Sequence, residues 1–441
     1  MRKEKLYVIL ITLTAVLVTA LEILDGTIVS VSLDAMRGSL GATINQMSWT
    51  MTGYITAAAI VMPLTGFLSQ RFGRKQLMLL SIAGFGISSV LCGFSTSLTE
   101  ILILRVLQGA FGSLLGPLSQ ALLADNFAPE DMGRAMAFYG LGLMTAPILG
   151  PIIGGIVTEY LNWRWDFFIN IPVCILAFIG VWILVKPSKR HKDQAIDWLG
   201  MILLFLSIGC LEYILNQGNE LEWFTSYRIL IMSFISLFSL VFFIMRGIEK
   251  KEKNIVDFSH FKDRNYTVST FIMLLFATAF IALNTWIPPL LERLQHYPII
   301  TAGLMMGPRG IASVVSMMFM PFIMKRVNNM YLVVFGFVFF ALGAFMISHY
   351  NPMVDQTFFI EANILQGVAT GLFFVPVSKI AYSTLPQAAR DGAAGLFNFS
   401  RTLGSSFGIA IFSDIIMKQG QVNWHSLRAG MSVTNPTFQH W

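Results

Sequence analysis

Long apolar runs, separated by short polar or basic segments, follow one another along almost the whole chain. A run near 20 residues, rising about 1.5 Å per residue as a helix, crosses a hydrocarbon core roughly 30 Å thick. The pattern therefore predicts an all-α polytopic membrane protein with thirteen spans, and no loop is long enough to fold as a soluble domain. The predicted spans are 6–35, 44–68, 76–96, 99–123, 132–158, 166–185, 197–216, 227–246, 265–290, 299–324, 330–350, 356–379 and 391–417.

Composition agrees with this interpretation. Hydrophobic residues make up 55% of the 441-residue chain and charged residues only 12%, whereas soluble proteins are about a quarter charged. With the N-terminus inside, 21 of the 30 lysines and arginines fall in loops on the N-terminal side and six in loops on the other side. Basic loops face the cytoplasm. We therefore expect a multi-pass protein of the cytoplasmic (inner) membrane with a cytoplasmic N-terminus, and we assign the net charge of +6 to topology rather than to nucleic-acid binding.

An internal repeat divides the predicted spans into two halves. "RVLQGA" at 105–110 resembles "NILQGV" at 363–368, and the same spacing of 258 residues carries "MP" at 62–63 onto "MP" at 320–321. Two pseudo-symmetric six-helix halves around a central cavity are typical of secondary transporters. We expect an N-terminal half over 1–185, two inserted spans over 186–264, and a C-terminal half over 265–441. The polar segment 424–441 stands where the last helix of the second half is expected, so we expect a shortened form that lacks this helix.

Charged side chains within the spans are the strongest candidates for function, because a charge in the bilayer core costs a few kcal/mol. Glu22 and Asp25 lie three residues apart on one face of the first span. Arg105 enters the fourth span from the opposite side of the membrane and reaches a similar depth, so we expect it to meet Asp25. This pair is either a fixed ion pair that holds two helices together or a proton-binding carboxylate tuned by a guanidinium.

Two glycine-rich stretches carry further candidates. "GFLSQRFGRK" (66–75) joins the second and third spans and is either a topology-setting basic loop or a gate. "APILGPIIGG" (146–155) lies within the fifth span and indicates either close helix packing or a functional kink. The residues singled out are Gly66, Arg71, Gly73 and Arg74 in the first stretch, and Pro147, Gly150, Pro151, Gly154 and Gly155 in the second.

Four other polar residues fall within predicted spans, namely Glu212, Arg309, Asn398 and Arg401. Each either links helices by hydrogen bonds or lines a cavity. The chain has no G-x-x-x-x-G-K-[ST] phosphate-binding loop, no H-E-x-x-H and no paired C-x-x-C. We therefore expect no enzymatic activity, no cofactor and no metal site.

Taken together, these stretches resemble the 14-span drug:proton antiporters of the major facilitator superfamily, EmrB/QacA type. The resemblance rests on "LDGTIVSVSL", "GFLSQRFGRK", "LRVLQGAFG", "APILGPIIGG", "NWRWDFFINIPV" and "IVDFSHFKDRN", which occur in the family's order and cover nearly all of the chain. Gln70 departs from the pattern, because the superfamily loop usually has Asp there.

The resemblance implies a major facilitator fold and proton-driven export of hydrophobic, amphipathic or cationic compounds. It further implies that Asp25 binds protons, that Arg105 assists it, and that the glycines and prolines of 146–155 shape the antiporter helix. Glu22 would tune Asp25 or contact a cationic substrate. A periplasmic membrane-fusion adaptor is an implied partner in a Gram-negative cell. The alternatives are a transporter of one defined metabolite and a truncated, non-transporting membrane protein.

Overall fold

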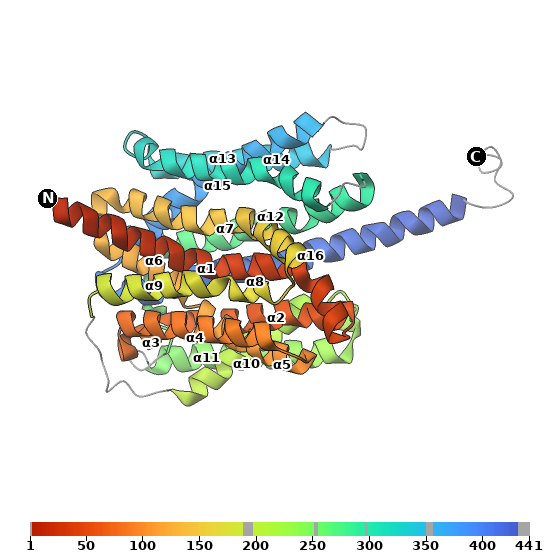
Figure 1. Ribbon diagram of the computed structural model, residues 1–441, viewed down its shortest axis with the longest axis horizontal. Helices are drawn as coiled ribbons and strands as arrows, with labels where there is room; N and C mark the ends of the chain where they lie inside the picture. Colours follow the sequence, from red (N-terminus) through yellow and green to blue (C-terminus); the bar gives the residue numbers. More distant parts are fainter. Residues whose placement is uncertain (1, 188–196, 251–254, 296–298, 350–355, 431–441) are drawn as a thin grey trace.

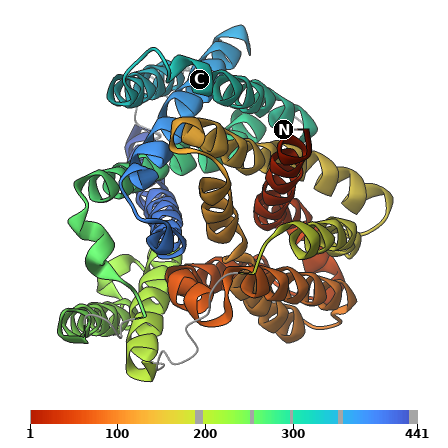
Figure 2. The same ribbon diagram turned by 90° about the vertical axis from the view of Figure 1, so that its left-hand side faces the viewer.

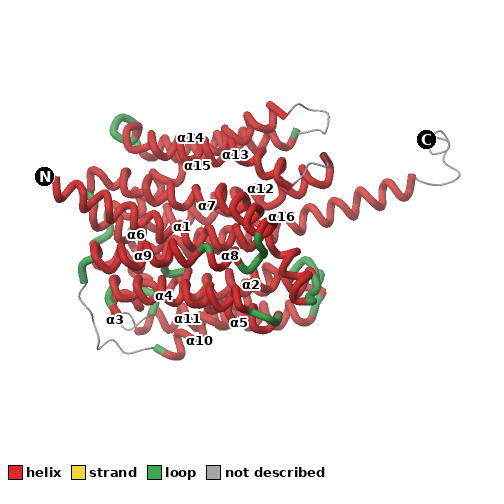
Figure 3. Tube along the Cα trace, viewed as in Figure 1, coloured by secondary structure: helices red, strands yellow, loops and turns green. Residues whose placement is uncertain are grey.

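The computed structural model describes residues 2–187, 197–250, 255–295, 299–349 and 356–430. Within these ranges the chain is helical and contains no β-strand (Figure 3). Twelve segments of the described residues are long and apolar enough to cross a membrane. The long helices, in chain order, are α1 (Arg2–Leu40), α2 (Ile44–Val61), α3 (Thr65–Phe72), α4 (Arg74–Phe94), α5 (Leu98–Gly112), α6 (Leu115–Asn126), α7 (Met132–Tyr160), α8 (Trp165–Phe168), α9 (Asn170–Leu184), α10 (Trp198–Gln217), α11 (Tyr227–Lys250), α12 (Arg264–Gln295), α13 (Ile299–Ile323), α14 (Asn329–Ser348), α15 (Gln356–Ser383) and α16 (Arg390–Gly430). Short 3-10 turns η1 to η5 lie at Met62–Leu64, Pro129–Asp131, Trp223–Thr225, Phe258–Lys262 and Gln387–Ala389.

Most predicted spans coincide with one of these helices, but three are divided. The span 44–68 comprises α2, η1 and part of α3, the span 99–123 comprises α5 and part of α6, and the span 166–185 comprises α8 and α9. In the span 99–123, Ser113 and Leu114 form a turn between α5 and α6, although both residues keep right-handed helical backbone angles. Pro117 lies in the first turn of α6, where its missing N–H leaves no helical bond unmade. Hydropathy alone does not reveal this break, because apolar residues continue through it.

The helices of the N-terminal half, α1 to α9, pack around α1. In this half α1 lies against α6, α7 and α9, while α2 packs on α5 and α4 packs on both α5 and α9. α12 to α16 form a second group in which α13 and α14 pack on α15, and α12 packs on α16 (Figure 1). The two groups meet where α7 contacts α13 and where α6 contacts α16.

Equivalent glycines place the two halves in register. A Cβ on Gly109 of α5 would lie 2.3 Å from the Tyr54 carbonyl oxygen of α2, and a Cβ on Gly367 of α15 would lie 2.3 Å from the Arg309 carbonyl oxygen of α13. Both glycines belong to the repeated "LQG" and are 258 residues apart, while the residues whose carbonyls they meet, Tyr54 and Arg309, are 255 apart. A similar close crossing therefore recurs within one helical turn of the predicted spacing. This correspondence supports the two halves that the repeat predicts.

The inserted helices α10 and α11 pack on each other at the periphery (Figure 2). α10 also contacts α2 of the first half and α16 of the second half. The inserted pair therefore covers one seam between the halves instead of standing apart from the bundle.

α16 contains the thirteenth predicted span, 391–417, and continues beyond it as an exposed helix to Gly430, which extends from the bundle in Figure 1. It is not among the twelve strongly apolar segments, because polar residues such as Asn398, Arg401 and Asp414 interrupt it. Residues 431–441, the rest of the polar segment discussed above, lie outside the described residues.

Candidate functional site

Asp25 lies at the centre of a buried polar cluster in the N-terminal half. Its Oδ2 is 2.5 Å from Nη1 of Arg105, which is the contact between α1 and α5 that the sequence predicts. Its Oδ1 accepts hydrogen bonds from Nε2 of Gln108 at 2.8 Å and from Nδ2 of Asn170 at 2.7 Å. Arg105 Nη1 also donates to Gln108 Oε1 at 2.7 Å. Three helices, α1, α5 and α9, thus each contribute to one carboxylate.

Aromatic rings enclose the guanidinium of this pair. The Arg105 guanidinium carbon is 4.2 Å from the centre of the Tyr54 ring and 5.9 Å from that of Phe167. Asp25 and Arg105 are both fully buried. Charge pairs of this kind are strong only when their remaining polar atoms are satisfied. Both Asp25 oxygens are satisfied, whereas Arg105 Nε has no partner within the described residues.

The side chain of Glu22 contacts other residues than that of Asp25, although both lie on the same face of α1. A carboxylate oxygen of Glu22 lies against Gly116 of α6 and accepts a hydrogen bond from its backbone N–H, and the carboxylate interacts electrostatically with Arg401 of α16. The predicted like-charge effect of Glu22 on Asp25 remains a prediction. The structure places Glu22 at the seam between the halves, where it faces Arg401 of α16.

Asn398 of α16 bonds directly to the N-terminal half. Its Oδ1 accepts from the Tyr139 hydroxyl at 2.9 Å, and its Nδ2 donates to Gln120 Oε1 at 2.6 Å. All three side chains are buried. Asn398 therefore links α16 to α6 and α7 in the middle of the bundle.

Glu212 of the inserted helix α10 belongs to a polar chain that crosses the covered seam. Ser406 of α16 donates to Glu212 Oε2 at 3.0 Å, and Asn216 donates to the same oxygen at 3.4 Å. Asn216 in turn accepts from Thr52 of α2 at 3.5 Å. Glu212 is fully buried, and its Oε1 has no partner within the described residues. This series of hydrogen bonds thus connects α2 of the first half to α16 of the second half through the inserted helix α10.

The 146–155 stretch forms the contact between α7 and α1. α7 runs as one helix through Pro147 and Pro151, although the side chain of Pro151 lies outside the described residues. A Cβ on Gly150 would lie 1.9 Å from Thr27 Oγ1, and one on Gly154 would lie 3.0 Å from the Ile28 carbonyl oxygen. Of the two interpretations of this stretch, close packing is what these distances support.

Replacing Gly150 tests this contact. We expect Gly150→Ala to lower the melting temperature and the transport rate, because the added methyl group meets Thr27 and overpacking costs about 1–3 kcal/mol. Gly155→Ala is the matched control, since no atom lies within 4 Å of a Cβ there. Thermal unfolding of the purified variants measures the difference. Equal melting temperatures would contradict close packing at Gly150.

The 66–75 loop takes part in an ion-pair network at the N-terminal face, the end of the bundle where α1 begins. Arg74 Nη1 is 2.5 Å from Asp125 Oδ2 at the end of α6, and Arg74 Nη2 is 2.7 Å from Asp391 Oδ1 in the first turn of α16. Arg390 pairs with Asp125 at 2.8 Å, and Ser69 donates to Asp391. These contacts join the two halves at this face.

Glycines allow the backbone to approach closely in the same place. A Cβ on Gly66 would lie 2.5 Å from the Cα of Gly392 in α16. Gly73 has φ 85°, a conformation that favours glycine, and it separates α3 from α4. Arg71 lies half-buried in the last turn of α3. Position 70, where the superfamily loop usually has Asp, is Gln. The carboxylates of this network come instead from Asp125 of the same half and Asp391 of the opposite half.

His260 borders this network from η4. A Cβ on Gly392 would lie 3.0 Å from its Nε2. Burial lowers the pKa of His260 despite the opposing effect of the Asp257 carboxylate. The imidazole is therefore neutral near pH 7, and the charge of the network comes from its arginines and aspartates.

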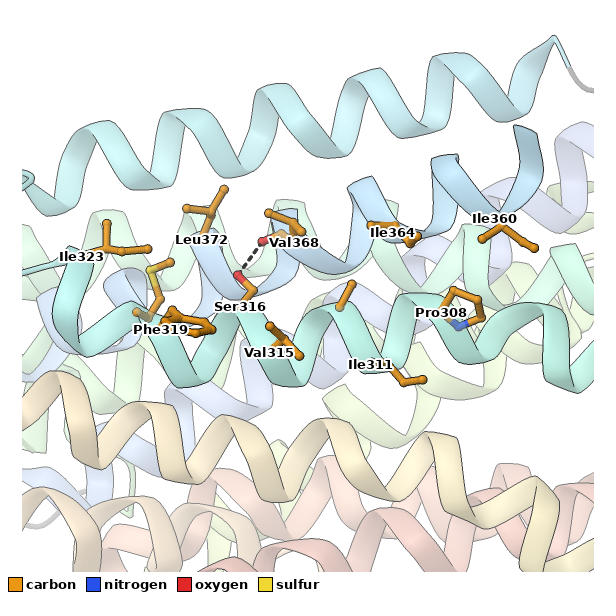
Figure 4. Close-up of a pocket in the computed structure, with 12 residues that line it drawn as sticks. Pro308, Ile311, Val315, Ser316, Phe319, Ile323, Ile360, Ile364, Val368 and Leu372 are labelled. Atoms are coloured by element: carbon orange, nitrogen blue, oxygen red, sulfur yellow. Dashed lines mark hydrogen bonds between the residues drawn. The ribbon is translucent and has the colours of Figure 1, made fainter. Parts of the chain in front are cut away.

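An apolar groove of about 710 Å³ lies between α13 and α15 (Figure 4). Ser316 crosses it and donates to the Val368 carbonyl oxygen at 3.0 Å. Ile311 and Phe319 on its wall are 63% and 59% exposed, so the groove opens to the outer surface of the bundle. None of the residues singled out in the sequence lines it.

Several members of these clusters carry little signal in the sequence. Gln108 lies in the repeated "LQG", and Asn170 lies in "NWRWDFFINIPV", but neither amide has a charge that demands a partner. Asp166 in the same stretch is buried and accepts from Thr158 at 2.8 Å. Asp125 and Asp391 lie at helix ends, where acidic residues are usually solvated.

Comparison with known proteins gives a consistent result. Residues 15–409 match the family model described as "Major Facilitator Superfamily". Among curated proteins, "Multidrug export protein EmrB" of Haemophilus influenzae is 34% identical over 433 residues, which cover 98% of this chain and 85% of the relative. "Multidrug export protein EmrB" of Escherichia coli is 32% identical over 99% of this chain and 85% of the relative. "Fatty acid resistance protein FarB" of Neisseria gonorrhoeae is 34% identical over 92% of this chain and 80% of the relative.

A solved structure shows the same fold. The proton:xylose symporter XylE superposes with a TM-score of 0.68 at 16% identity, covering 96% of this chain and 91% of that chain. The family match spans most of the chain, and relatives above 30% identity span nearly all of it. This chain therefore belongs to the major facilitator superfamily, within its group of EmrB-type exporters.

Proposed function

We propose that this protein is a proton-coupled antiporter that exports hydrophobic or amphipathic compounds across the cytoplasmic membrane. Relatives with 32–34% identity are named multidrug export proteins, and family membership favours a transporter over an enzyme. The observation that carries the coupling mechanism is the buried Asp25 carboxylate with its three donors, Arg105, Gln108 and Asn170.

An ionisable group inside a membrane bundle is by default a functional candidate. Arg105 and the amides of Gln108 and Asn170 bond the Asp25 carboxylate in a fully buried site. A rearrangement of α1, α5 or α9 that weakened any of the three bonds would favour proton uptake. The same carboxylate would thus bind a proton in one conformation and release it in another.

The ion-pair network at the N-terminal face is the proposed gate. The excess of basic residues in the loops on this side assigns it to the cytoplasm, an orientation that a reporter fused to Met1 would test. Arg74 bonds carboxylates from both halves, so opening this face requires these bonds to break. In the structure these bonds are formed, which corresponds to a closed state of the proposed gate.

The seam between the halves is the proposed substrate path. Glu22 faces it from α1, and Asn398 and Arg401 face it from α16. Glu22 would contact cationic substrates, while the surrounding apolar side chains would contact their hydrophobic parts. Glu212 contributes a further carboxylate from the inserted pair.

Flux in everted membrane vesicles tests the proposed function. We expect an added lipophilic cation to release protons from the acidified lumen and to accumulate there, and vesicles that lack the protein should do neither. A pH-sensitive dye and a radiolabelled substrate measure the two fluxes. Accumulation without proton release would disprove coupling, and absence of both for a panel of hydrophobic compounds would disprove multidrug export.

A further inference from the structure

The groove between α13 and α15 is a long apolar depression on the outer surface of the C-terminal half. It runs from Pro308 and Ile360 at one end to Ile323 and Leu372 at the other (Figure 4). At about 1.5 Å per residue, α13 rises about 22 Å from Pro308 to Ile323. This length exceeds half of a hydrocarbon core roughly 30 Å thick. The groove can therefore accommodate an acyl chain from one leaflet of the bilayer.

Close packing of the two helices forms the floor of the groove. A Cβ on Gly371 of α15 would collide with Ser316 of α13, and one on Gly367 would lie 2.7 Å from the Cβ of Ala312. The Ser316 hydroxyl donates to the Val368 carbonyl oxygen, so it presents no unsatisfied donor to an occupant. Small residues thus bring the backbones together, and the larger apolar side chains beside them form the walls.

Three basic side chains lie at the end of the groove that is nearest the N-terminal face. The Arg326 backbone N–H donates to the Ile323 carbonyl oxygen at 3.0 Å in the turn that ends α13, and Lys325 lies in the same turn. Lys379 follows Leu372 by seven residues on α15, so it lies on the same helix face. Lys325 and Arg326 are exposed and Lys379 is half-buried. We call these three residues the basic cluster.

The beginning of α7 lies between the two sides of the basic cluster. A Cβ on Gly133 would lie 3.4 Å from the sulfur of Met324 and 4.0 Å from Cδ of Lys379. Asp131, just before α7, is already paired with Arg134 at 3.2 Å. In the described ranges of the chain, no carboxylate forms an ion pair with a member of the basic cluster. Its positive charge is therefore available to an anion at the membrane surface.

We propose that the groove and the basic cluster together bind one anionic phospholipid from the leaflet at the N-terminal face. One acyl chain would lie in the groove, and the phosphate would contact the basic cluster. Basic pockets between membrane helices bind the headgroups of anionic lipids in this way, whereas an apolar helix of a partner protein would offer these cations no anion. The bound lipid is neither substrate nor coupling ion. The inference therefore goes beyond the proposed function and is tested without transport.

Native mass spectrometry of the purified full chain tests the role of the charge. The probes are phosphatidylglycerol and phosphatidylcholine with identical acyl chains, and we expect the parent to bind one phosphatidylglycerol at least about tenfold more tightly. Each Lys or Arg near a membrane surface strengthens anionic-lipid binding about fivefold, so Lys325→Gln with Arg326→Gln should weaken phosphatidylglycerol binding about thirtyfold.

Lys186→Gln with Lys262→Gln is the matched control for charge. Both residues are exposed, and they belong to neither α13 nor α15. This double variant loses the same net charge and should bind phosphatidylglycerol like the parent. Equal affinity of the parent for the two lipids, or equal losses in the two double variants, would overturn the proposal.

Val315→Trp tests the role of the groove. Val315 lines the groove and is 45% exposed, so a tryptophan there would fill the space for the acyl chain without a change of charge. We expect phosphatidylglycerol binding at least about tenfold weaker than in the parent. Leu342→Trp is the matched control, because Leu342 of α14 is 48% exposed and does not line the groove.

Two outcomes of this substitution would contradict the proposal. If Val315→Trp binds phosphatidylglycerol as tightly as Leu342→Trp does, the lipid contacts only the basic cluster and the groove holds no acyl chain. The same spectra report the oligomeric state. If the parent is a dimer that Val315→Trp dissociates, a second copy of the chain occupies the groove instead of a lipid.

Discussion

Asp25→Asn is expected to abolish substrate-driven proton release. The substitution keeps the size of the side chain and removes its negative charge, so neither proton binding nor the ion pair with Arg105 remains. Removing one partner of a buried pair typically costs 3–5 kcal/mol, so we also expect a lower melting temperature. Asp25→Glu keeps a titratable group and should recover part of the proton release.

The measurement is dye-monitored proton release in everted vesicles that contain equal amounts of folded protein. Asp34→Asn is the matched control on the same helix. Asp34 is 86% exposed and pairs only loosely with Arg37 at 3.6 Å, so we expect parental activity. Proton release by a folded Asp25→Asn variant at the parental rate would show that the pair with Arg105 is structural and that coupling lies elsewhere.

The second large effect is expected at the gate. Arg74→Gln removes the ion pairs to Asp125 and Asp391, whose side chains are only 9% and 14% exposed. The N-terminal face should then open more often, because these pairs join the two halves. Each 1.4 kcal/mol lost from the closed state raises the open population about tenfold while that population is small. We expect an increase of at least about this size.

A cysteine in place of the fully buried Ala394 of α16 reports this opening. Its rate of reaction with a membrane-impermeant maleimide, applied from the N-terminal face, should rise in the Arg74→Gln background. Arg134→Gln is the matched control, because Arg134 and its partner Asp131 are 44% and 39% exposed and such pairs contribute little. Equal labelling rates in both backgrounds would rule out a gating role for Arg74.

The sequence anticipates the arrangement of helices well and their interruptions poorly. Apolar runs of membrane length locate the helices, because hydrocarbon admits few other backbone structures. The break at Ser113 and Leu114 leaves the hydropathy unchanged and therefore escapes this argument. The position of α10 across the seam also has no sequence signal, since it depends on contacts with α2 and α16 that no local pattern encodes.

The candidate site shows a similar division. Asp25 and Arg105 are predictable as a pair, because opposite charges at the same depth of the bilayer, here in the first and fourth spans, are most stable together. Asn170 and Gln108 are neutral, and many amides in membrane helices serve only to link them. Asp391 lies far along the chain from Arg74, and its role at the gate follows only from the packing of α16 on α3.

The contact between Gly66 and Gly392 offers a way to arrest the transport cycle. A methyl group on Gly66 would lie 2.5 Å from the Cα of Gly392, a distance that real Cβ atoms do not reach, and backbone cannot rotate away as a side chain can. A larger residue at Gly66 would therefore act as a wedge that forces α3 and α16 apart. Such a variant would accumulate molecules with this face open, and would supply for structure determination the conformation complementary to the closed one described above.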